Sequence, residues 1–291
     1  MQKTKKTYPV PSVLAMHDLS CLGRCSLSAV TPVLSAMGVQ VIPLPTALLS
    51  SQTDGVEGYY FRDLSPDLVQ IARHFIDLSL HPQAICSGFA ASPAQCELLS
   101  GIFDAFGTGA LKLVDPVLGD GGALYASCEK QMIPQMRKVC AHADLLTPNL
   151  TEACLLTEIS CADTAGLSAV ELKSYIGRLF DALCDLGAPR AVITGIPTGD
   201  GRICTAGIDR TAPDAEPFYT SVERVEGSYP GTGDLFASVL LGKLLFGASL
   251  SSAAEAASSF VQKTVAFTAA NGGARENGVC FEPFLCELGQ R

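Results

Sequence analysis

The sequence predicts an α/β fold, in which a mostly parallel β-sheet is covered by helices on both faces. Over roughly the first 200 residues, short apolar runs rich in β-branched residues alternate with longer helical patterns. Each short run ends in Gly, Pro, Asp, Asn or other polar residues, as strands do when they stop at a turn. The chain has 291 residues, 48% of them hydrophobic, so it can bury such a sheet.

The predicted elements follow one another in a regular order. Six strands are expected, at SVLAM, VQVIPL, AICSG, LKLVDP, DLLTPN and AVITG. The helices expected among them cover residues 26–37, 65–80, 92–107, 130–141, 149–156 and 168–187. Ligands of such sheets bind beyond the carboxyl ends of the strands, so the segments just after each strand matter most for a site. These are HDLS at 17–20, SGF at 87–89, DPVLGD at 115–120, TPNLTE at 147–152 and TGIP at 194–197.

The pattern changes after residue 200. RICTAGID (202–209) and PFYTSVERV (217–225) are separated by a polar loop that contains proline, which predicts an antiparallel hairpin at one edge of the sheet. No repeat, low-complexity segment or break in composition divides the chain. We therefore expect a single domain over residues 11–291, preceded by a short basic tail, residues 1–10.

Two helices are expected to close the chain. The first begins at Asp234 and stops at Gly247. The second opens on Ser252 and Glu255, which are spaced as in a capping box, and ends at Asn271.

The charge of the chain excludes several functions. The net charge is -9 and no basic stripe is present, so we expect neither a nucleic-acid partner nor a membrane-surface partner. The basic N-terminal segment leads into no long apolar run, which argues against a signal peptide. The longest apolar stretch, Leu235 to Leu250, is interrupted by Lys243 and is too short to span a bilayer.

The cysteines and histidines favour a reducing compartment and no zinc site. None of the twelve cysteines forms a CxxC pair, and they stand singly within apolar runs, as buried free thiols do. The four histidines show no metal-ligand spacing. We therefore expect a cytoplasmic protein.

The stretch GTGD opens a helix with apolar residues on nearly every side, so this helix is expected to be buried. Its first N–H groups lack helical partners, and Gly231 and Gly233 leave them open to approach by a phosphate or a developing anion. Asp234 has two interpretations. It offsets the helix dipole, or it takes a proton from a hydroxyl group that attacks a phosphate.

Polar side chains also follow two neighbouring predicted strands. Asp115 comes directly after one strand and Asp120 follows in a glycine-rich turn, while Thr147, Asn149 and Glu152 follow the next strand. Carboxylate and amide oxygens are the ligands that suit Mg²⁺ carrying nucleotide phosphates. Each motif alone is also explained by turn or cap chemistry, but their combination beside an anion site favours a nucleotide site.

In combination these motifs resemble those of a known group of enzymes. DPVLGD, then TPNLTEA about 30 residues later, then GTGD at the start of the penultimate helix, are similar to the ribokinase-like superfamily, over about Val13 to Gly272. The combination narrows the resemblance to the vitamin B6 and hydroxymethylpyrimidine kinases. LPTALLSSQT favours the B6 branch, the pyridoxal, pyridoxine and pyridoxamine kinases, and HDLSCLGRCSLSAV resembles a pyridoxamine kinase subgroup.

The resemblance implies a three-layer ribokinase-like fold, a homodimer, and the use of ATP and Mg²⁺, with a K⁺ requirement left open. It implies that Asp234 is the base and that Gly231, Thr232 and Gly233 form the anion hole. It also assigns Asp115, Asp120 and Glu152 to the metal, and these three together with Tyr125, Thr147, Asn149 and Thr194 to ATP. Thr53, Phe89 and Asp234 are assigned to the substrate, and Asp18 joins them at a position where the chain departs from the family pattern.

One departure from the family pattern bears on the substrate. Many pyridoxal kinases carry serine in the first loop, where this chain has His17 and Asp18. Asp18 either favours a protonated pyridine or the aminomethyl group of pyridoxamine, or only orders the loop. We expect His17 to be structural.

The function expected from the resemblance is ATP-dependent phosphorylation of the 5′-hydroxymethyl group of a B6 vitamer, in salvage of pyridoxal 5′-phosphate. The first alternative is a hydroxymethylpyrimidine kinase of thiamin synthesis. The second is a non-catalytic B6-binding protein built on a kinase fold, which would have no need of a base.

Overall fold

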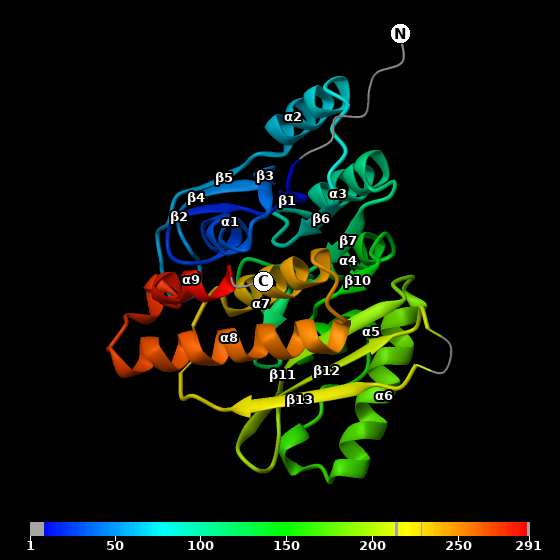
Figure 1. Ribbon diagram of the computed structural model, residues 1–291, viewed down its shortest axis with the longest axis vertical. Coiled ribbons are helices and arrows are strands. Elements are labelled where there is room, and N and C mark those ends of the chain that lie inside the picture. The colour runs from blue at the N-terminus through cyan, green and yellow to red at the C-terminus, as the bar shows by residue number, and fades with distance from the viewer. Residues whose placement is uncertain (1–8, 213–214, 228, 290–291) are drawn as a thin grey trace.

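A sheet of eight strands runs through the part of the chain that this computed structural model describes, residues 9–212, 215–227 and 229–289 (Figure 1). The strands are ordered β13-β12-β11-β10-β7-β6-β1-β3. Neighbours from β3 to β11 run parallel, whereas β11, β12 and β13 are antiparallel. The bounds are β1 Ser12–Met16, β3 Gln40–Pro43, β6 Ala84–Ser87, β7 Leu111–Val114, β10 Leu145–Leu146, β11 Arg190–Pro197, β12 Arg202–Asp209 and β13 Phe218–Glu223. The predicted α/β class is therefore confirmed, with its antiparallel hairpin at the edge of the sheet.

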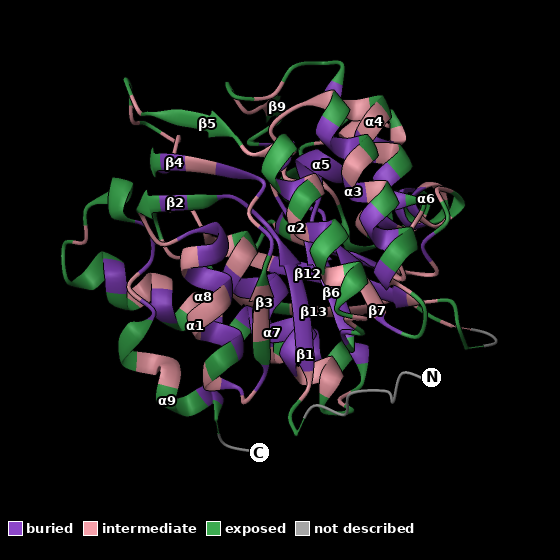
Figure 2. Ribbon diagram, turned by 90° about the horizontal axis from the view of Figure 1, so that it is seen from above, coloured by how far each residue is buried: buried purple, intermediate pink, exposed green. Residues whose placement is uncertain are grey.

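Helices cover both faces of this sheet and make the fold three-layered (Figures 1 and 2). One face is covered by α1 Ser26–Ala36, α7 Thr232–Leu245, α8 Leu250–Ala270 and the short α9 Leu285–Leu288. The other is covered by α2 Ser65–Asp77, α3 Pro93–Phe106, α4 Met132–Cys140, α5 Leu150–Thr157 and α6 Ala169–Asp185.

Strand β1 contributes side chains to the cores on both faces of the sheet. Val13 and Ala15 pack into the core formed with α1, α7 and α8, whereas Leu14 and Met16 pack into the core on the opposite face. All four side chains are fully buried. Because successive side chains of a strand point to opposite faces, a strand covered on both sides has a continuous apolar sequence, as SVLAM does.

A second, three-stranded sheet lies beside the central one and was not predicted. It is formed by β2 Leu19–Leu22, β4 Ala47–Ser51 and β5 Phe61–Asp63. Figure 2 shows β2 and β5 largely exposed, and Leu19, Leu22 and Phe61 are among the exposed large apolar side chains. A small hairpin of β8 Gly119–Asp120 and β9 Ala123–Leu124 was also missed.

Two helices begin earlier than predicted. Helix α7 starts at Thr232, so Asp234 belongs to its first turn rather than opening it. Helix α8 starts at Leu250, and its N-cap is Ser249, whose hydroxyl accepts a hydrogen bond from Ser252 N at 3.2 Å. The predicted capping box at Ser252 was therefore wrong by one turn, because the serine that leaves the helix backbone is Ser249.

The structure also bears on the predictions about membranes, cysteines and the tail. None of the helices in the described part of the chain is long and apolar enough to cross a membrane. All twelve cysteines are free, as predicted, and six of them are buried. Of the predicted basic tail, residues 1–8 lie outside the described residues.

Candidate active site

A cavity of about 1170 Å³ lies at the carboxyl ends of the parallel strands, where the N-termini of α1 and α7 also meet. Every site residue proposed from the sequence lines it. They are Asp18, Thr53, Phe89, Asp115, Asp120, Tyr125, Thr147, Asn149, Glu152, Thr194, Gly231, Thr232, Gly233 and Asp234. The structure thus brings all of them together, while the role of each remains a prediction.

The N-terminus of α7 has a backbone that only glycine fits. Gly231 is the N-cap, with a left-handed φ of 87°, and a Cβ placed on it would lie 1.9 Å from the carbonyl oxygen of Arg24. The first amides of α7 have no preceding helical carbonyl to bond, and they open on the cavity. This end of a buried helix is therefore suited to a negatively charged group.

The carboxylate of Asp234 is held from two sides. Its Oδ2 accepts a hydrogen bond from the backbone N–H of Ser26 at 2.8 Å, and its Oδ1 lies 3.5 Å from Nδ1 of His17. Ser26 is the first residue of α1. Asp234 thus stands at the N-terminal ends of two helices, α1 and its own α7.

Ser26 connects Asp234 to a second carboxylate. Its hydroxyl donates to Oδ1 of Asp18 at 2.5 Å, and Ser20 donates to Oδ2 of Asp18 at 2.9 Å. Asp18 is buried, and its burial raises the pKa of this carboxyl, with the hydroxyl groups of Ser26 and Ser20 opposing the rise. Asp18 also lines the cavity.

Glu152 and Asn149 form a capping box at the start of α5. Asn149 Oδ1 accepts from Glu152 N, and Glu152 Oε2 accepts from Asn149 N, both at 2.9 Å. The same two side chains also bind the preceding turn, since Glu152 Oε1 accepts from Leu118 N at 2.9 Å and Asn149 Nδ2 donates to Gly119 O at 2.8 Å. The cap explanation of this motif is therefore confirmed, while its role in binding ATP stays a prediction.

Two buried acidic side chains line the cavity near the end of β7 and the start of α5. Burial raises the pKa of Glu152 to about 7, against three hydrogen bonds from backbone amides that lower it. Burial also raises the pKa of Asp115 well above its usual range, and the charges of Glu152 and Asp234 raise it further. Both carboxyls are costly to ionise where they are buried, and a bound cation would offset that cost.

A metal ion would be held here only in part by protein. Among residues 9–212, 215–227 and 229–289, no three His, Cys, Asp or Glu side chains are grouped so that they hold an ion on their own. Mg²⁺ commonly keeps several waters and binds one or two carboxylates plus substrate phosphates. One or two of the carboxylates of Asp115, Asp120 and Glu152, completed by phosphate oxygens and waters, fit Mg²⁺ that arrives with a nucleotide.

The two threonines predicted to bind the nucleotide lie on neighbouring strands of the central sheet, one just after β10 and one within β11. Thr147 follows β10, and its Oγ1 is buried without a hydrogen-bond partner among the described residues. Thr194 lies in β11 at an irregularity of the ladder, where its backbone N–H donates to Pro148 O at 3.0 Å. A buried hydroxyl that lines a cavity and lacks a partner fits an anionic oxygen of a ligand.

The remaining predicted residues lie around the mouth of the cavity. Thr53 follows Gln52, whose Nε2 donates to Asp54 O at 2.9 Å and to Glu276 O at 3.3 Å, so the loop is tied to the segment after α8. Phe89 follows β6 and is half-buried. Tyr125 comes directly after the β8–β9 hairpin, and burial raises the pKa of its hydroxyl.

Two residues with direct contacts to the site were not proposed as site residues. Ser26 holds both Asp18 and Asp234, and His17 lies against Asp234. The only signal for them in the sequence is their position, directly after the first strand and at the start of the first helix.

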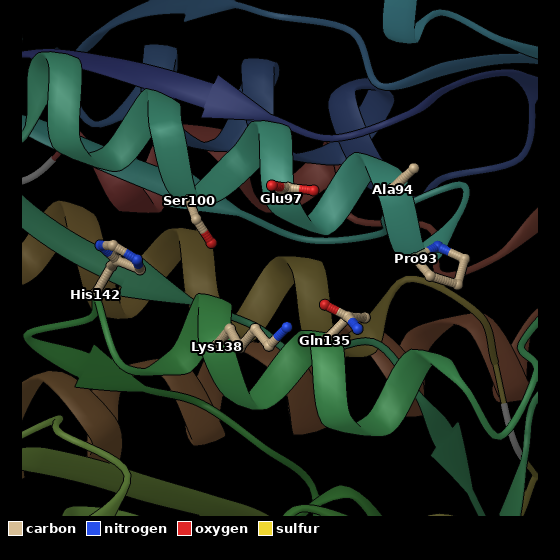
Figure 3. Close-up of a pocket in the computed structure, with 7 residues that line it drawn as sticks. All are labelled: Pro93, Ala94, Glu97, Ser100, Gln135, Lys138 and His142. Atoms are coloured by element: carbon tan, nitrogen blue, oxygen red, sulfur yellow. The ribbon is translucent and has the colours of Figure 1, made fainter.

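A second cavity, of about 410 Å³, lies between α3 and α4 (Figure 3). Figure 3 shows Glu97 and Ser100 of α3 facing Gln135 and Lys138 of α4, with His142 at one end. None of the residues proposed from the sequence lines it. The first cavity is therefore the candidate active site.

The sequence of the chain is similar to that of known and candidate kinases. The model of the family described as phosphomethylpyrimidine kinase matches residues 29–279. A Schizosaccharomyces pombe protein described as a candidate pyridoxal kinase is 28% identical over 249 residues, which cover 78% of this chain and 72% of that protein. Bovine pyridoxal kinase is 33% identical over 141 residues, 44% of this chain and 42% of that enzyme.

Solved structures match over nearly the whole chain. A candidate phosphomethylpyrimidine kinase from Bacteroides thetaiotaomicron has a TM-score of 0.90 with 33% identity, covering 98% of this chain and 96% of that one. A crystal form described as containing pyridoxal gives a TM-score of 0.86 with 34% identity, covering 96% of both chains. Pyridoxal kinase from Lactobacillus plantarum gives 0.84 with 32% identity, covering 97% of both.

Proposed function

We propose, since this chain belongs to the phosphomethylpyrimidine kinase family, that it transfers a phosphoryl group from ATP to a hydroxymethyl group on a small heteroaromatic ring. The resemblance to the vitamin B6 branch of the ribokinase-like kinases, predicted from the motifs, is confirmed by the comparisons. The acceptor we propose is the 5′-hydroxymethyl group of a B6 vitamer.

The observation that carries this proposal is the position of Asp234. Asp234 lies in the first turn of a buried helix, beside amides that lack helical partners, and the buried acids Asp115 and Glu152 line the same cavity. The cavity therefore combines a proton acceptor with an anion site. A binding protein needs the pocket but has no use for a base placed there, so the arrangement favours a phosphotransferase over a non-catalytic B6-binding protein.

The proposed reaction is an in-line displacement. The substrate hydroxyl oxygen forms a bond to the γ-phosphorus, the bond from phosphorus to the bridging oxygen breaks, and ADP leaves with that electron pair. Asp234 accepts the hydroxyl proton, while the amides of Gly231, Thr232 and Gly233 face the negative charge of the transferring group. Asp115, Asp120 and Glu152 would hold Mg²⁺, which neutralises phosphate charge when bound.

The choice of a B6 vitamer is supported by what the related proteins are described as. The S. pombe and L. plantarum proteins are described as pyridoxal kinases, and one B. thetaiotaomicron crystal form is described with pyridoxal. The family description, phosphomethylpyrimidine kinase, keeps hydroxymethylpyrimidine as the second candidate substrate. Asp18, a buried acid in the cavity, supports a cationic ring or an aminomethyl group.

We also propose a cytoplasmic homodimer in which residues 11–291 form one kinase domain. The support for the dimer is that exposed large apolar side chains lie in or next to the three-stranded sheet, namely Leu19, Leu22, Tyr60 and Phe61. Sedimentation of the purified protein tests it. A monomer at all concentrations would contradict the proposal.

The experiment that tests the function is ADP release by the purified protein with Mg-ATP and K⁺. The panel of acceptors is pyridoxal, pyridoxamine, pyridoxine and hydroxymethylpyrimidine, with Asp234→Asn as the control. Turnover of a B6 vitamer that is lost in the control supports the proposal, and omission of K⁺ tests the monovalent cation. Turnover of hydroxymethylpyrimidine alone assigns the protein to thiamin synthesis, and no turnover by the folded protein contradicts kinase activity.

A further inference from the structure

His17 lies buried directly beside the proposed base. It follows β1 in the chain, only 2% of its surface is exposed, and its Nδ1 lies 3.5 Å from Oδ1 of Asp234. Neither of its ring nitrogens has a hydrogen-bond partner among the described residues. A buried polar group without a partner destabilises a fold, so its presence calls for an explanation other than packing.

The imidazole ring is also confined. A Cβ added to Gly88 would lie 2.3 Å from Nδ1 and 2.6 Å from Cε1 of His17, so the backbone after β6 lies against the ring. The carbonyl of His17 accepts a hydrogen bond from Thr46 N at 3.0 Å, which fixes the backbone of the same residue. The backbone at Gly88 therefore limits movement of the ring on that side.

The groups that interact electrostatically with His17 are mostly acidic. They are Asp234 of α7, Cys86 of β6, the adjacent Asp18 and Asp115 at the end of β7. Burial by itself would lower the pKa of His17, but its interactions with Asp234 and Cys86 outweigh burial and raise the pKa to about 10. These interactions favour the protonated ring, whose Nδ1 lies toward the carboxylate of Asp234.

We propose that His17 is a positioning residue, which acts through Asp234 by fixing the orientation of its carboxylate. Ser26 N holds Oδ2 from one side and His17 faces Oδ1 from the other, so the carboxylate has one orientation toward the cavity. His17 itself is not among the residues that line the cavity, and it takes no part in the bonds that form and break. The inference rests on the proposed function, because orientation of a base affects only a reaction that uses it.

A structural role for His17 alone predicts different kinetics. If the ring only fills space, its replacement changes stability and affects catalysis equally whether or not Asp234 is a carboxylate. If it acts through Asp234, its replacement affects catalysis only while that carboxylate is present. A double-mutant cycle between the two positions separates these cases.

The test compares the parent with His17→Phe, His17→Asn, Asp234→Asn and the double variant His17→Phe/Asp234→Asn, using single-turnover and steady-state ADP release. Phenylalanine keeps the ring but has no nitrogen, and asparagine keeps a donor near the position of Nδ1. We expect His17→Phe to lower kcat by about 10- to 100-fold, the scale of a misplaced catalytic group, with KM for ATP changed by less than about 3-fold. His17→Asn should recover part of the loss, and His17→Phe should have no further effect in the Asp234→Asn background.

Two outcomes overturn the assignment: a kcat of His17→Phe equal to that of the parent, or the same loss of kcat in both backgrounds. Absence of turnover in the parent itself overturns the proposed function instead, so the two failures are distinct. Gly88→Ala provides a second test if His17→Phe does not fold, because its Cβ displaces the ring while leaving the imidazole in place. It should lower kcat with KM for ATP unchanged, and a normal kcat in that variant would count against the assignment.

Discussion

Replacement of Gly231 by alanine tests the geometry of the α7 N-terminus. Two costs add at this position. The left-handed backbone, φ 87°, costs a residue with a Cβ about 1–2 kcal/mol. The new Cβ would also lie 1.9 Å from the Arg24 carbonyl oxygen, so helix and loop must separate by about 1 Å, an overpacking cost of about 1–3 kcal/mol. We therefore expect Gly231→Ala to lower the free energy of unfolding by about 2–5 kcal/mol.

Gly247 provides a matched control for the cost of the left-handed backbone conformation. Gly247, after α7, has nearly the same φ of 86°, and a Cβ there would meet nothing within 4 Å. Gly247→Ala should therefore cost only about 1–2 kcal/mol. Urea unfolding measures both free energies, and ADP release measures the effect on kcat, which we expect to fall about 100-fold for Gly231→Ala and to stay unchanged for Gly247→Ala.

Equal stability losses in the two variants would refute this reasoning. They would mean that the contact between Gly231 and the Arg24 carbonyl adds nothing to the cost of the backbone conformation. A normal kcat in Gly231→Ala would likewise show that the position of the first α7 amides is unimportant for turnover.

Three further predictions concern the acidic residues. Asp234→Asn should lower kcat by about 100- to 10,000-fold with little change in KM for ATP, and steady-state kinetics with a near-normal kcat would refute its role as base. Asp18→Ser should lower kcat/KM for pyridoxamine more than for pyridoxal, since it removes a buried acid from the cavity; an unchanged ratio would show that Asp18 only orders its loop. Because the pKa of Glu152 is raised from 4.5 to about 7, its ionisation opposes folding, so without ligands the parent should lose stability relative to Glu152→Gln as the pH rises from about 4.5 to 7. Thermal unfolding across this pH range measures the difference, and parallel curves would contradict the shift.

The elements of the central sheet could be predicted because each carries a strong local pattern. β1 and β6 are continuous apolar runs, and the hairpin of β12 and β13 is rich in β-branched and aromatic residues. The three-stranded sheet could not be predicted in the same way. The sequence of β2, LSCL, has no alternation of buried apolar residues, since only Ser20 is buried. This strand forms because β4 pairs with it.

The candidate site, too, could be predicted only in part. Asp115 and Thr147 could be placed in it because the carboxyl ends of parallel strands meet at one edge, so their position in the sequence implies their position in space. The contacts of Ser26 and His17 with Asp234 join residues more than 200 positions apart. No local pattern specifies such contacts, since they depend on how α1 and α7 pack side by side.

The hydrogen bond between Ser26 and Asp234 also has a consequence for how the protein is made. A ribosome delivers Ser26 early and Asp234 only after four fifths of the chain, so the site has no base while synthesis is in progress. The closing of so long a loop is entropically unfavourable until the intervening sheet has formed. The site is therefore complete only late in folding. Activity then indicates that α1, near the start of the chain, and α7, near its end, have packed together.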